Sequence, residues 1–554
     1  MSTLLEGLDE QQRLVATSLD APVCVLAGAG TGKTRSITHR IAYGVSSGVY
    51  QPDQVLALTF TTKAAAEMGH RLADLGVAGV ATRTFHSAAL RQLTHFWPEL
   101  TGGRVPDVLA SKASVITAAL QAMKIDASQA LVRDLAGDIE WRKVNGYTLE
   151  EYRQARPARG GMPGGMSVDV VAQIHERYES LKDDLSRIDF EDVLLATSGM
   201  LDAHPRVLDH VRAQYRVFVV DEYQDVSPLQ QRLLDQWVGE REDIVVVGDA
   251  SQTIYSFAGA SSSYLLDFPE RYPGAHVITL ETNYRSGGEI VRAANQVMRG
   301  RPGALQLAPA SQSQAPLRRH VASDDLAEAR WVVEEIRAWV DQGRTLDEVA
   351  VLMRFGAQSV PIETALREAG IGVMVQGRQG FFSEPHIKRA VMEIRGAAVA
   401  GVPGDIVDVV ADILFGIGLT PEPPAHPGAE RSKWEDLSAL LELAKDTEGM
   451  TLADFSASLA SRMESGDAPG RGQVTLSSVH AAKGQEWPFV IIIGLAEGLF
   501  PISYATSEDA IEEERRLFYV GLTRAREQLA LGVAERSRAG QAPRQVSRFL
   551  RELG

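Results

Sequence analysis

A glycine-rich loop near the N-terminus carries the clearest chemistry in this sequence. Residues 27–34 read Ala-Gly-Ala-Gly-Thr-Gly-Lys-Thr and follow the apolar run at residues 23–26. Glycines in a loop between a strand and a helix let several backbone N–H groups point into one concavity that binds phosphate oxygens. Lys33 can reach the terminal phosphates, and the hydroxyl of Thr34 can ligate Mg²⁺. The loop therefore predicts nucleotide hydrolysis, although Ala27 stands where the strict motif has its first glycine and a plain glycine-rich turn is the alternative.

Two carboxylates follow a second apolar run. Asp221 and Glu222 come directly after residues 217–220. Two acids at the end of a buried strand cost free energy unless a cation uses them, and ligands bind at the carboxyl edge of open parallel sheets. We therefore expect Asp221 to hold Mg²⁺ beside Thr34, mainly through water, and Glu222 to polarise the attacking water as a general base. The alternative is a pair of solvated carboxylates in a turn.

A third apolar run ends next to a candidate sensor of the nucleotide. Gln252 follows residues 244–247 and is placed to sense the γ-phosphate or its water. Tyr255 and Phe257 lie just beyond and offer flat faces. Alone, such aromatic residues are most often core, but beside a nucleotide sensor they become candidate stacking platforms for bases.

Arginines in two later segments complete the candidate catalytic set. Arg285 lies in residues 283–286, and Arg524 lies in residues 513–526. Phosphoryl transfer needs cations where charge develops on the γ-phosphate, and one arginine there can contribute roughly 10³ to 10⁵ in rate. We expect both arginines to come from a second sheet domain, so that nucleotide lies in a cleft contacted by both domains and its hydrolysis opens and closes that cleft.

Short apolar, β-branched runs recur along the chain, each followed by a polar or glycine-containing turn and helical patterning. The runs are residues 23–26, 55–60, 217–220, 244–247 and 277–280 in the first half, and 349–353, 373–375, 474–479, 490–493 and 529–533 in the second. Buried parallel strands have this continuous apolar character, so the runs predict an α/β fold with two parallel-sheet domains. Little strand pattern occurs at about 86–189 or 389–473, and both stretches are expected to be helical insertions.

Composition and charge exclude several classes of protein. The 554 residues are 45% hydrophobic and 23% charged, which fits a globular protein of several domains. The net charge of −16, from 56 basic and 72 acidic residues, argues against a wholly basic nucleic-acid coat but allows a local basic track. Cys24 is the one cysteine, which excludes an intrachain disulfide and a cysteine-rich zinc cluster, and its apolar surroundings predict a core residue. A polar N-terminus and apolar runs of strand length predict a cytoplasmic protein without a membrane segment.

Taken in order, these motifs resemble superfamily 1 DNA helicases of the UvrD/PcrA/Rep family. Further segments extend the resemblance along nearly the whole chain. They are Leu8-Asp9-Glu10-Gln11-Gln12, Thr59-Phe60-Thr61-Thr62-Lys63, Thr84-Phe85-His86-Ser87 and Val479-His480-Ala481-Ala482-Lys483-Gly484-Gln485-Glu486-Trp487. Ten or so motifs in one order make a chance resemblance negligible.

The resemblance implies a role for each matched residue and the cofactors ATP and Mg²⁺. The residues implied to hold the adenine are Gln12, Arg35 and Tyr284, with Tyr284 stacking on it. Those implied to surround the phosphates are Ala29, Gly30, Thr31, Gly32, Lys33 and Thr34, and the hydrolytic centre adds Asp221, Glu222 and Gln252, with Thr34 and Asp221 on the metal. Arg285 and Arg524 are implied to be arginine fingers, and Glu486 to contact the nucleotide. The residues implied to face single-stranded DNA are Phe60, His86, Tyr255 and Phe257.

The family's architecture implies two RecA-like parallel-sheet domains, each with a mainly helical insertion. The implied boundaries are 1–88 and 186–278 for the first sheet domain, 89–185 for its insertion, 279–388 and 472–554 for the second sheet domain, and 389–471 for a reduced second insertion. The implied activity is ATP-dependent 3′→5′ DNA unwinding and translocation along single strands, in DNA repair or replication maintenance. The implied partners are single-stranded DNA, 3′-tailed duplex DNA and repair or replication proteins, with no membrane partner. The implied state is a monomer or weak dimer that acts at a bacterial nucleoid.

Three departures from the family pattern leave a second function open. Phe257-Ala258 stand where the family usually has Trp-Arg, Gln485 replaces the usual leucine, and the second insertion is much shorter. The alternative is therefore a single-strand-dependent ATPase and translocase that removes proteins from DNA and unwinds poorly without a partner. A DNA-binding adaptor with an inactive nucleotide site is a third interpretation, against which the intact catalytic set argues.

Overall fold

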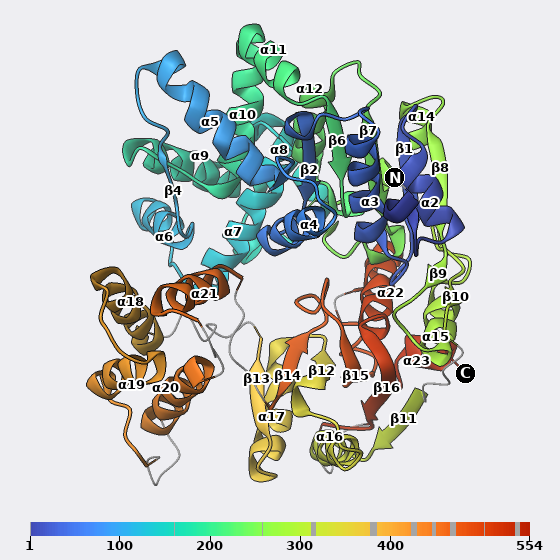
Figure 1. Ribbon diagram of the computed structural model, residues 1–554, viewed down its shortest axis with the longest axis vertical. Helices are drawn as coiled ribbons and strands as arrows, with labels where there is room; N and C mark the ends of the chain where they lie inside the picture. The colour runs from blue at the N-terminus through green and yellow to red at the C-terminus, as the bar shows by residue number, and fades with distance from the viewer. Residues whose placement is uncertain are drawn as a thin grey trace. The chain divides into compact units, whose positions relative to one another are not determined.

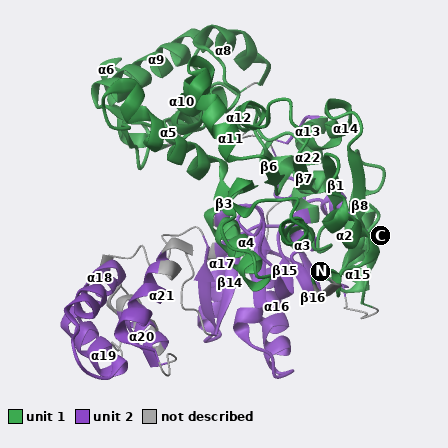
Figure 2. Ribbon diagram, turned by 45° about the horizontal axis from the view of Figure 1, so that its top comes forward, with its two compact units in different colours: residues 1–312, 508–519 green, residues 313–507, 520–554 purple. Residues whose placement is uncertain are grey.

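Two compact units make up the chain (Figure 2). The computed structural model describes residues 2–159, 161–256, 259–311, 317–376, 385–422, 429–445, 450–465, 472–503, 505–537 and 543–553. Unit 1 comprises Met1–Gln312 and Glu508–Tyr519, and unit 2 comprises Ser313–Ser507 and Val520–Gly554. The helix α22 (Glu508–Leu522) contributes to both units, since the part of it up to Tyr519 groups with unit 1.

Unit 1 is built on a parallel sheet (Figure 1). Among the described residues, its six strands run in the order β3-β2-β6-β7-β1-β8, and every neighbouring pair is parallel. The strands are β1 (Val23–Ala27), β2 (Val55–Thr59), β3 (Ala81–Thr84), β6 (Val217–Val220), β7 (Ile244–Gly248) and β8 (His276–Leu280). Because β7 lies between β6 and β1, the loops that follow these three strands share one edge of the sheet.

Both faces of this sheet are buried, which explains the uninterrupted apolar runs in its central strands. On one face Val25 packs in a cluster with Ile37 of α3 (Lys33–Ser46), and on the other Cys24 packs in a cluster with Trp237 of α12 (Pro228–Val238). Cys24 is 1% exposed, and burial raises the pKa of its thiol to about 12. The prediction that Cys24 is a core residue is confirmed.

Helices cover the sheet of unit 1 and form its insertion. Those near the sheet in sequence are α1 (Ser2–Leu5), α2 (Glu10–Thr17), α4 (Thr62–Asp74), α5 (Phe85–Thr101), α10 (Phe190–Ala203), α11 (Pro205–Gln214), α13 (Ser263–Leu266), α14 (Phe268–Arg271) and α15 (Gly288–Met298). The insertion contains α6 (Ala113–Ala122), α7 (Gln129–Val144), α8 (Leu149–Ala155) and α9 (Val168–Asp184). The first predicted helical stretch is thus confirmed, apart from the two-residue strands β4 (Asp107–Val108) and β5 (Arg187–Ile188). Two further short strands, β9 (Thr282–Asn283) and β10 (Ala308–Pro309), pair with each other.

Unit 2 contains the second parallel sheet. Among the described residues, its six strands run in the order β11-β16-β15-β12-β14-β13, again all parallel. The strands are β11 (Leu317–Ala322), β12 (Val349–Met353), β13 (Gly372–Val375), β14 (Gln473–Ser478), β15 (Trp487–Ile492) and β16 (Ala525–Ala534). Central strand residues such as Val351 and Phe489 form a core with Trp339 of α16 (Asp325–Val340).

The helices between β13 and β14 have a core of their own. They are α18 (Pro385–Ala400), α19 (Ile406–Ile417), α20 (Ala429–Lys445) and α21 (Leu452–Ser465), and Ile394, Leu414, Leu440 and Phe455 pack together among them. The second predicted helical stretch is therefore confirmed where the structure describes it. The remaining helices of unit 2 are α17 (Ser359–Glu368) and α23 (Arg548–Glu552).

The prediction of an α/β fold with two parallel sheets is confirmed, whereas the exact boundaries of the four implied domains stay a prediction. Of the strands in the two six-stranded sheets, β3 and β11 were not predicted, because both are edge strands with partly exposed residues and no continuous apolar run. By its contacts Arg285 groups with unit 1, and its expected place in the second sheet domain stays a prediction. In the part of the chain that the structure describes, no helix is long and apolar enough to cross a membrane.

Candidate nucleotide-binding and DNA-binding site

The carboxyl edge of the sheet in unit 1 gathers most of the predicted chemistry. The glycine-rich loop follows β1, the two acids follow β6, Gln252 follows β7 and Asn283 follows β8. Since β6, β7, β1 and β8 are consecutive neighbours in the sheet, segments that are far apart in the sequence meet at this edge.

Two glycines give the loop after β1 the backbone of a phosphate cradle. Gly30 and Gly32 have φ values of 69° and 79°, which glycine adopts without a steric penalty. A Cβ atom on Gly30 would lie 2.7 Å from the side-chain nitrogen of Asn283 and 2.7 Å from Cβ of Arg285. The loop can therefore approach the segment after β8 only because residue 30 has no side chain.

Polar contacts inside the loop hold its shape. The Thr31 hydroxyl donates to the Gly28 carbonyl at 2.9 Å. Lys33 is the first residue of α3, and its Nζ approaches the Ala27 carbonyl at 3.4 Å. The backbone N–H groups at the start of α3 favour an anion at this position, so the loop fits the phosphates of a nucleotide.

Thr34 and Asp221 meet at the predicted metal site. The Thr34 hydroxyl donates to Asp221 Oδ2 at 3.2 Å. Burial and the charge of Glu222 raise the pKa of Asp221 to about 7, although Lys33 lowers it. A hydroxyl and a carboxylate side by side are oxygen ligands of the kind that Mg²⁺ takes from a protein when phosphates and water supply the rest. The two residues fit Mg²⁺, which would bring positive charge to the phosphate oxygens.

Glu222 has a backbone conformation that is unusual for a residue with a side chain. Its φ of 52° and ψ of 41° lie in the left-handed region, which costs of order 1–3 kcal/mol and is typical of functional sites. Its backbone N–H donates to Asp221 Oδ1 at 2.9 Å, and its carboxylate accepts a hydrogen bond from Gln224 Nε2 at 2.6 Å. The surrounding contacts thus hold the predicted general base in a single orientation.

A buried chain of hydrogen bonds joins the predicted base to the predicted sensor. Besides binding Glu222, Gln224 accepts from the backbone N–H of Asp249 at 3.0 Å, and Asp249 Oδ2 accepts from Gln252 Nε2 at 2.7 Å. Gln224 and Asp249 were not among the predicted site residues. Gly248 permits this close approach, because a Cβ atom there would lie 2.5 Å from Gln224 Oε1.

Asn283 fastens the segment that carries Arg285 to the glycine-rich loop. Its Nδ2 donates to the Ala29 carbonyl at 2.7 Å, and its Oδ1 accepts from the backbone N–H of Arg285 at 3.0 Å. The backbone N–H of Tyr284 donates to the Gly30 carbonyl at 2.8 Å. These bonds explain why Arg285 lies in unit 1, beside the place where phosphates are predicted to bind.

Tyr519 of α22 contacts the same loops. Its hydroxyl donates to Asp249 Oδ2 at 3.3 Å and accepts from the backbone N–H of Ala29 at 3.4 Å. One turn earlier, Arg516 Nε donates to the Thr253 carbonyl at 2.7 Å. Tyr519 was not among the predicted site residues, and its spacing in a helical pattern gave no sign of these contacts.

The predicted adenine residues gather on one side of the loop. Gln12 Nε2 donates to the Thr31 carbonyl at 2.9 Å, and the Tyr284 hydroxyl donates to Asp9 Oδ2 at 2.6 Å. Tyr284 is 52% exposed, which leaves its ring face available for stacking. Arg35 bonds a carbonyl of the segment that precedes α2. The structure therefore brings Gln12, Arg35 and Tyr284 to the same loop, while their role toward adenine stays a prediction.

Two of the predicted DNA-facing aromatic residues stack on each other. The rings of Phe60 and Tyr255 are nearly parallel, with centroids 5.9 Å apart and 7° between the planes. Phe60 remains 39% exposed, and burial raises the pKa of Tyr255 to about 12. Phe257, the third predicted aromatic residue of this group, lies outside the described residues.

His86 stacks on an aromatic residue that the sequence analysis missed. The rings of His86 and Phe190 have centroids 3.7 Å apart and 13° between their planes. Burial and the charge of Lys112 lower the pKa of His86 to about 4, so the ring is neutral at neutral pH. Phe190 is 54% exposed at the start of α10, where an apolar residue between Asp189 and Glu191 was the available signal.

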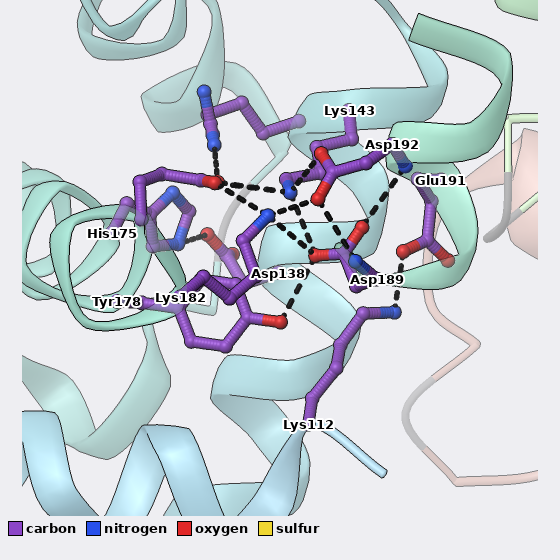
Figure 3. Close-up of polar contacts among 11 residues, drawn as sticks. Lys112, Asp138, Lys143, His175, Tyr178, Lys182, Asp189, Glu191 and Asp192 are labelled. Carbon is purple, nitrogen blue, oxygen red and sulfur yellow. Dashed lines mark hydrogen bonds and ion pairs between the residues drawn. The ribbon is translucent and has the colours of Figure 1, made fainter. Parts of the chain in front are cut away.

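A cluster of ion pairs holds the start of α10 to the helical insertion (Figure 3). We call it the α10 anchor, and its members are Lys112, Lys143, Glu179, Lys182, Asp189, Glu191 and Asp192. Lys143 Nζ lies 2.6 Å from Asp189 Oδ2 and 2.7 Å from Asp192 Oδ1, and Lys112 Nζ lies 2.7 Å from Glu191 Oε2. Burial acts to raise the pKa of Asp189, but the nearby lysines outweigh it and hold that pKa well below its usual range. The anchor thus pairs Asp189 and Glu191, the two acids that flank Phe190, with lysines of the insertion.

We expect Lys143→Met to lower the free energy of unfolding by about 3–5 kcal/mol, because it removes a cation from Asp189, which is 1% exposed. Chemical denaturation at neutral pH measures the loss. Since the pKa of Asp189 lies below its ordinary 3.8 in the fold, its stabilisation is fully present above pH 3.8 and is lost as the pH falls through the lower value. Arg232→Ala is the control, because it removes an exposed ion pair with Asp202 and should cost at most about 1 kcal/mol. An equally small loss for Lys143→Met would contradict a stabilising anchor.

Two predicted nucleotide contacts lie in unit 2. Arg524 is 2% exposed, and its guanidinium donates to the Gln485 carbonyl at 3.1 Å and to the Val520 carbonyl at 3.0 Å. Glu486 is exposed, and its carboxylate lies 3.9 Å from the guanidinium of Arg526. The roles of Arg524 as an arginine finger and of Glu486 as a nucleotide contact stay predictions.

Comparison with known proteins shows which family has this sequence. The UvrD/REP helicase N-terminal domain matches residues 8–273, and the UvrD-like helicase C-terminal domain matches residues 278–398 and 421–536. The chain is 44% identical to the ATP-dependent DNA helicase UvrD2 of Mycobacterium tuberculosis, over 99% of this chain and 81% of that protein. It is 30% identical to the ATP-dependent DNA helicase PcrA of Bacillus subtilis, over 99% and 86%, and 29% identical to DNA helicase II of Escherichia coli, over 100% and 88%.

The matched segments contain the features described above. The N-terminal match includes the glycine-rich loop, the Thr34–Asp221 contact and the Phe60–Tyr255 stack, and the C-terminal match includes Arg285 and Arg524. Two parallel sheets with helical insertions and these two domain matches lead to one conclusion: the chain belongs to the UvrD/REP helicase family.

Proposed function

We propose that the protein is an ATP-dependent DNA helicase that moves 3′→5′ along single-stranded DNA in DNA repair or replication-fork maintenance. Its proposed cofactors are ATP and Mg²⁺, and its proposed substrates are single-stranded and 3′-tailed duplex DNA. The observation that carries the proposal is that the Thr34–Asp221 contact and the Phe60–Tyr255 stack both arise from loops at the carboxyl edge of one sheet. The relatives, which are DNA helicases by name, support it.

Hydrolysis would use the residues at that edge. Lys33 and the N-terminal N–H groups of α3 would hold the phosphates, and Thr34 with Asp221 would hold Mg²⁺. Glu222 would accept the proton of the attacking water. The hydrogen bonds through Gln224 and Asp249 would hold Gln252 at a fixed position relative to Glu222. The arginine fingers would stabilise the charge that develops on the γ-phosphate.

DNA binding would use the exposed aromatic faces next to the hydrolytic residues. Base stacking on an aromatic ring tolerates any sequence, which suits a motor that moves along arbitrary DNA. Tyr255 follows Gln252 by three residues, so a movement of Gln252 in response to the γ-phosphate would be transmitted through a short segment to the Phe60–Tyr255 stack. We propose that the protein acts in the cytoplasm at the nucleoid, as a monomer or weak dimer, with repair or replication proteins.

The proposal is tested with purified protein, ATP and defined DNA. We expect single-stranded DNA to stimulate ATP turnover, and a 3′-tailed duplex to be unwound while a 5′-tailed duplex is not. Turnover at the same rate with and without DNA would refute the proposal. If DNA stimulates turnover and streptavidin is displaced from biotinylated single strands without unwinding, the alternative of a protein-removing translocase is the correct one.

Tyr255→Ala should weaken binding of single-stranded DNA by roughly 5- to 150-fold, because stacking contributes about 1–3 kcal/mol per base. The loss of the ring also removes the partner that stacks on Phe60. Fluorescence anisotropy with a labelled oligonucleotide measures the change. Tyr255→Phe keeps the ring and is the control, so equal affinity in the two variants would argue against base stacking at this position.

A further inference from the structure

Two glutamine side chains in unit 2 form a pair beside the loop that binds Arg524. Gln376 directly follows the edge strand β13, and Gln485 lies in the loop between β14 and β15. The strands β13 and β14 are neighbours in the sheet (Figure 1). Gln376 Nε2 donates to Gln485 Oε1 at 2.9 Å, and Gln485 Nε2 donates to Gln376 Oε1 at 3.3 Å. We call this contact the amide pair.

Other polar groups fix both members of the amide pair. The buried hydroxyl of Ser477 donates to Gln376 Oε1 at 2.8 Å, and the backbone N–H of Gln376 donates to the Leu476 carbonyl at 2.8 Å. Gln485 Nε2 also donates to the Ala481 carbonyl at 2.9 Å, within its own loop. Both hydrogens of the Gln485 amide and its oxygen are therefore used, and a leucine at this position could make none of these bonds.

The backbone of the same loop binds Arg524 from two sides. The Gln485 carbonyl accepts from Arg524 Nη1 at 3.1 Å. Two residues later, the backbone N–H of Trp487 donates to the Arg524 carbonyl at 3.0 Å. A shift of residues 485–487 would therefore move both the guanidinium and the backbone of Arg524.

We propose that Gln376 and Gln485 are positioning residues for Arg524. The amide pair holds residue 485 against β13, and residue 485 holds the guanidinium through its carbonyl. Neither glutamine needs to touch the nucleotide for this role. The inference rests on the proposed function of Arg524 as an arginine finger, whose contribution depends on where the guanidinium lies when charge develops on the γ-phosphate.

Gln376→Ala should lower the kcat of DNA-stimulated ATP hydrolysis about threefold to tenfold, as expected for the loss of a hydrogen bond that orients a catalytic group. The KM for ATP and the affinity for single-stranded DNA should change less than about twofold, because the variant leaves the binding residues of unit 1 intact. Gln485→Leu should have the same effect, and since it keeps the side-chain volume it serves if Gln376→Ala fails to fold. Gln342→Ala is the control, because Gln342 is exposed and its side-chain amide donates to the Ala338 carbonyl, four residues earlier in the same part of the chain.

The deciding measurement repeats Gln376→Ala in an Arg524→Ala background. If the amide pair acts through Arg524, the second substitution should lower kcat no further, and Gln376→Ala with Gln485→Ala together should equal either alone. An equal fold loss with and without Arg524 would overturn the inference, since it would indicate a general structural effect. If Arg524→Ala lowers kcat but Gln376→Ala does not, the inference about the amide pair is overturned while the finger role of Arg524 stands. Unchanged turnover in Arg524→Ala would remove the finger role itself, and with it the basis of the inference.

Discussion

Lys33→Ala should lower ATP turnover by about 10²–10³-fold, because it removes a cation beside the predicted phosphate positions. Lys33 begins α3, directly after the cradle formed by the glycine-rich loop, and its charge acts on the buried Asp221. The variant should fold normally, since Lys33 is only half-buried and its contact with the Ala27 carbonyl is long, at 3.4 Å. Phosphate release in the presence of single-stranded DNA measures the effect.

Lys33→Met separates the charge of the side chain from its bulk. Methionine keeps a stem of similar length without the ammonium group, so its turnover should fall as far as that of the alanine variant. Thermal unfolding of all three proteins should be closely similar. Turnover near the wild-type rate in a folded Lys33→Ala protein would show that hydrolysis does not occur at this loop.

Arg285→Ala should reduce ATP turnover by about 10³-fold or more, the range expected for an arginine that stabilises charge on the γ-phosphate. Asn283 holds the Arg285 segment against the glycine-rich loop, and Cβ of Arg285 lies where a side chain on Gly30 would have to be. Because that charge develops mainly in the transition state, the affinity for ATP should change far less than kcat. Single-turnover hydrolysis and binding of a fluorescent ATP analogue measure the two quantities separately.

A nearby arginine provides the matched control. Arg292 lies on α15 with its side chain 64% exposed, in an ion pair with Glu289. Arg292→Ala removes the same charge from the same part of unit 1 and should leave turnover within about twofold of the wild type, as is usual for exposed pairs. A parallel loss of affinity and rate in Arg285→Ala would mean that Arg285 binds the nucleotide equally in the ground state and is not a finger.

The sequence predicts the central strands well because they are buried on both faces. The run at residues 217–220 coincides with β6 (Val217–Val220), and that at 349–353 coincides with β12 (Val349–Met353). The edge strands β3 and β11 were missed because one side of each is partly exposed, and polar residues interrupt the apolar pattern. The start of β16 was also missed: the strand begins at Ala525, ahead of the predicted run at residues 529–533, because the exposed residues Arg526 and Glu527 interrupt the apolar pattern.

The candidate site was predictable to the extent that its residues lie next to strand ends. The sequence alone placed Lys33, Thr34, Asp221 and Glu222 in two short loops, and the structure brings Thr34 and Asp221 into contact. Their supporting contacts could not be predicted, because each joins segments whose proximity depends on strand order. Gln224 reaches Asp249 only because β6 and β7 are neighbours.

Local patterns of apolar residues, glycines and charges are enough to predict the chemistry at each strand end, the two parallel sheets and the family. Three features became evident only from the folded chain: Arg285 groups with unit 1, Phe190 stacks on His86, and Gln376 reaches Gln485. The partners in those contacts depend on the order of the strands in each sheet and on the packing of the helices. A hydrogen bond or ring stack of this kind has no periodicity along the chain, so no local pattern can reveal it.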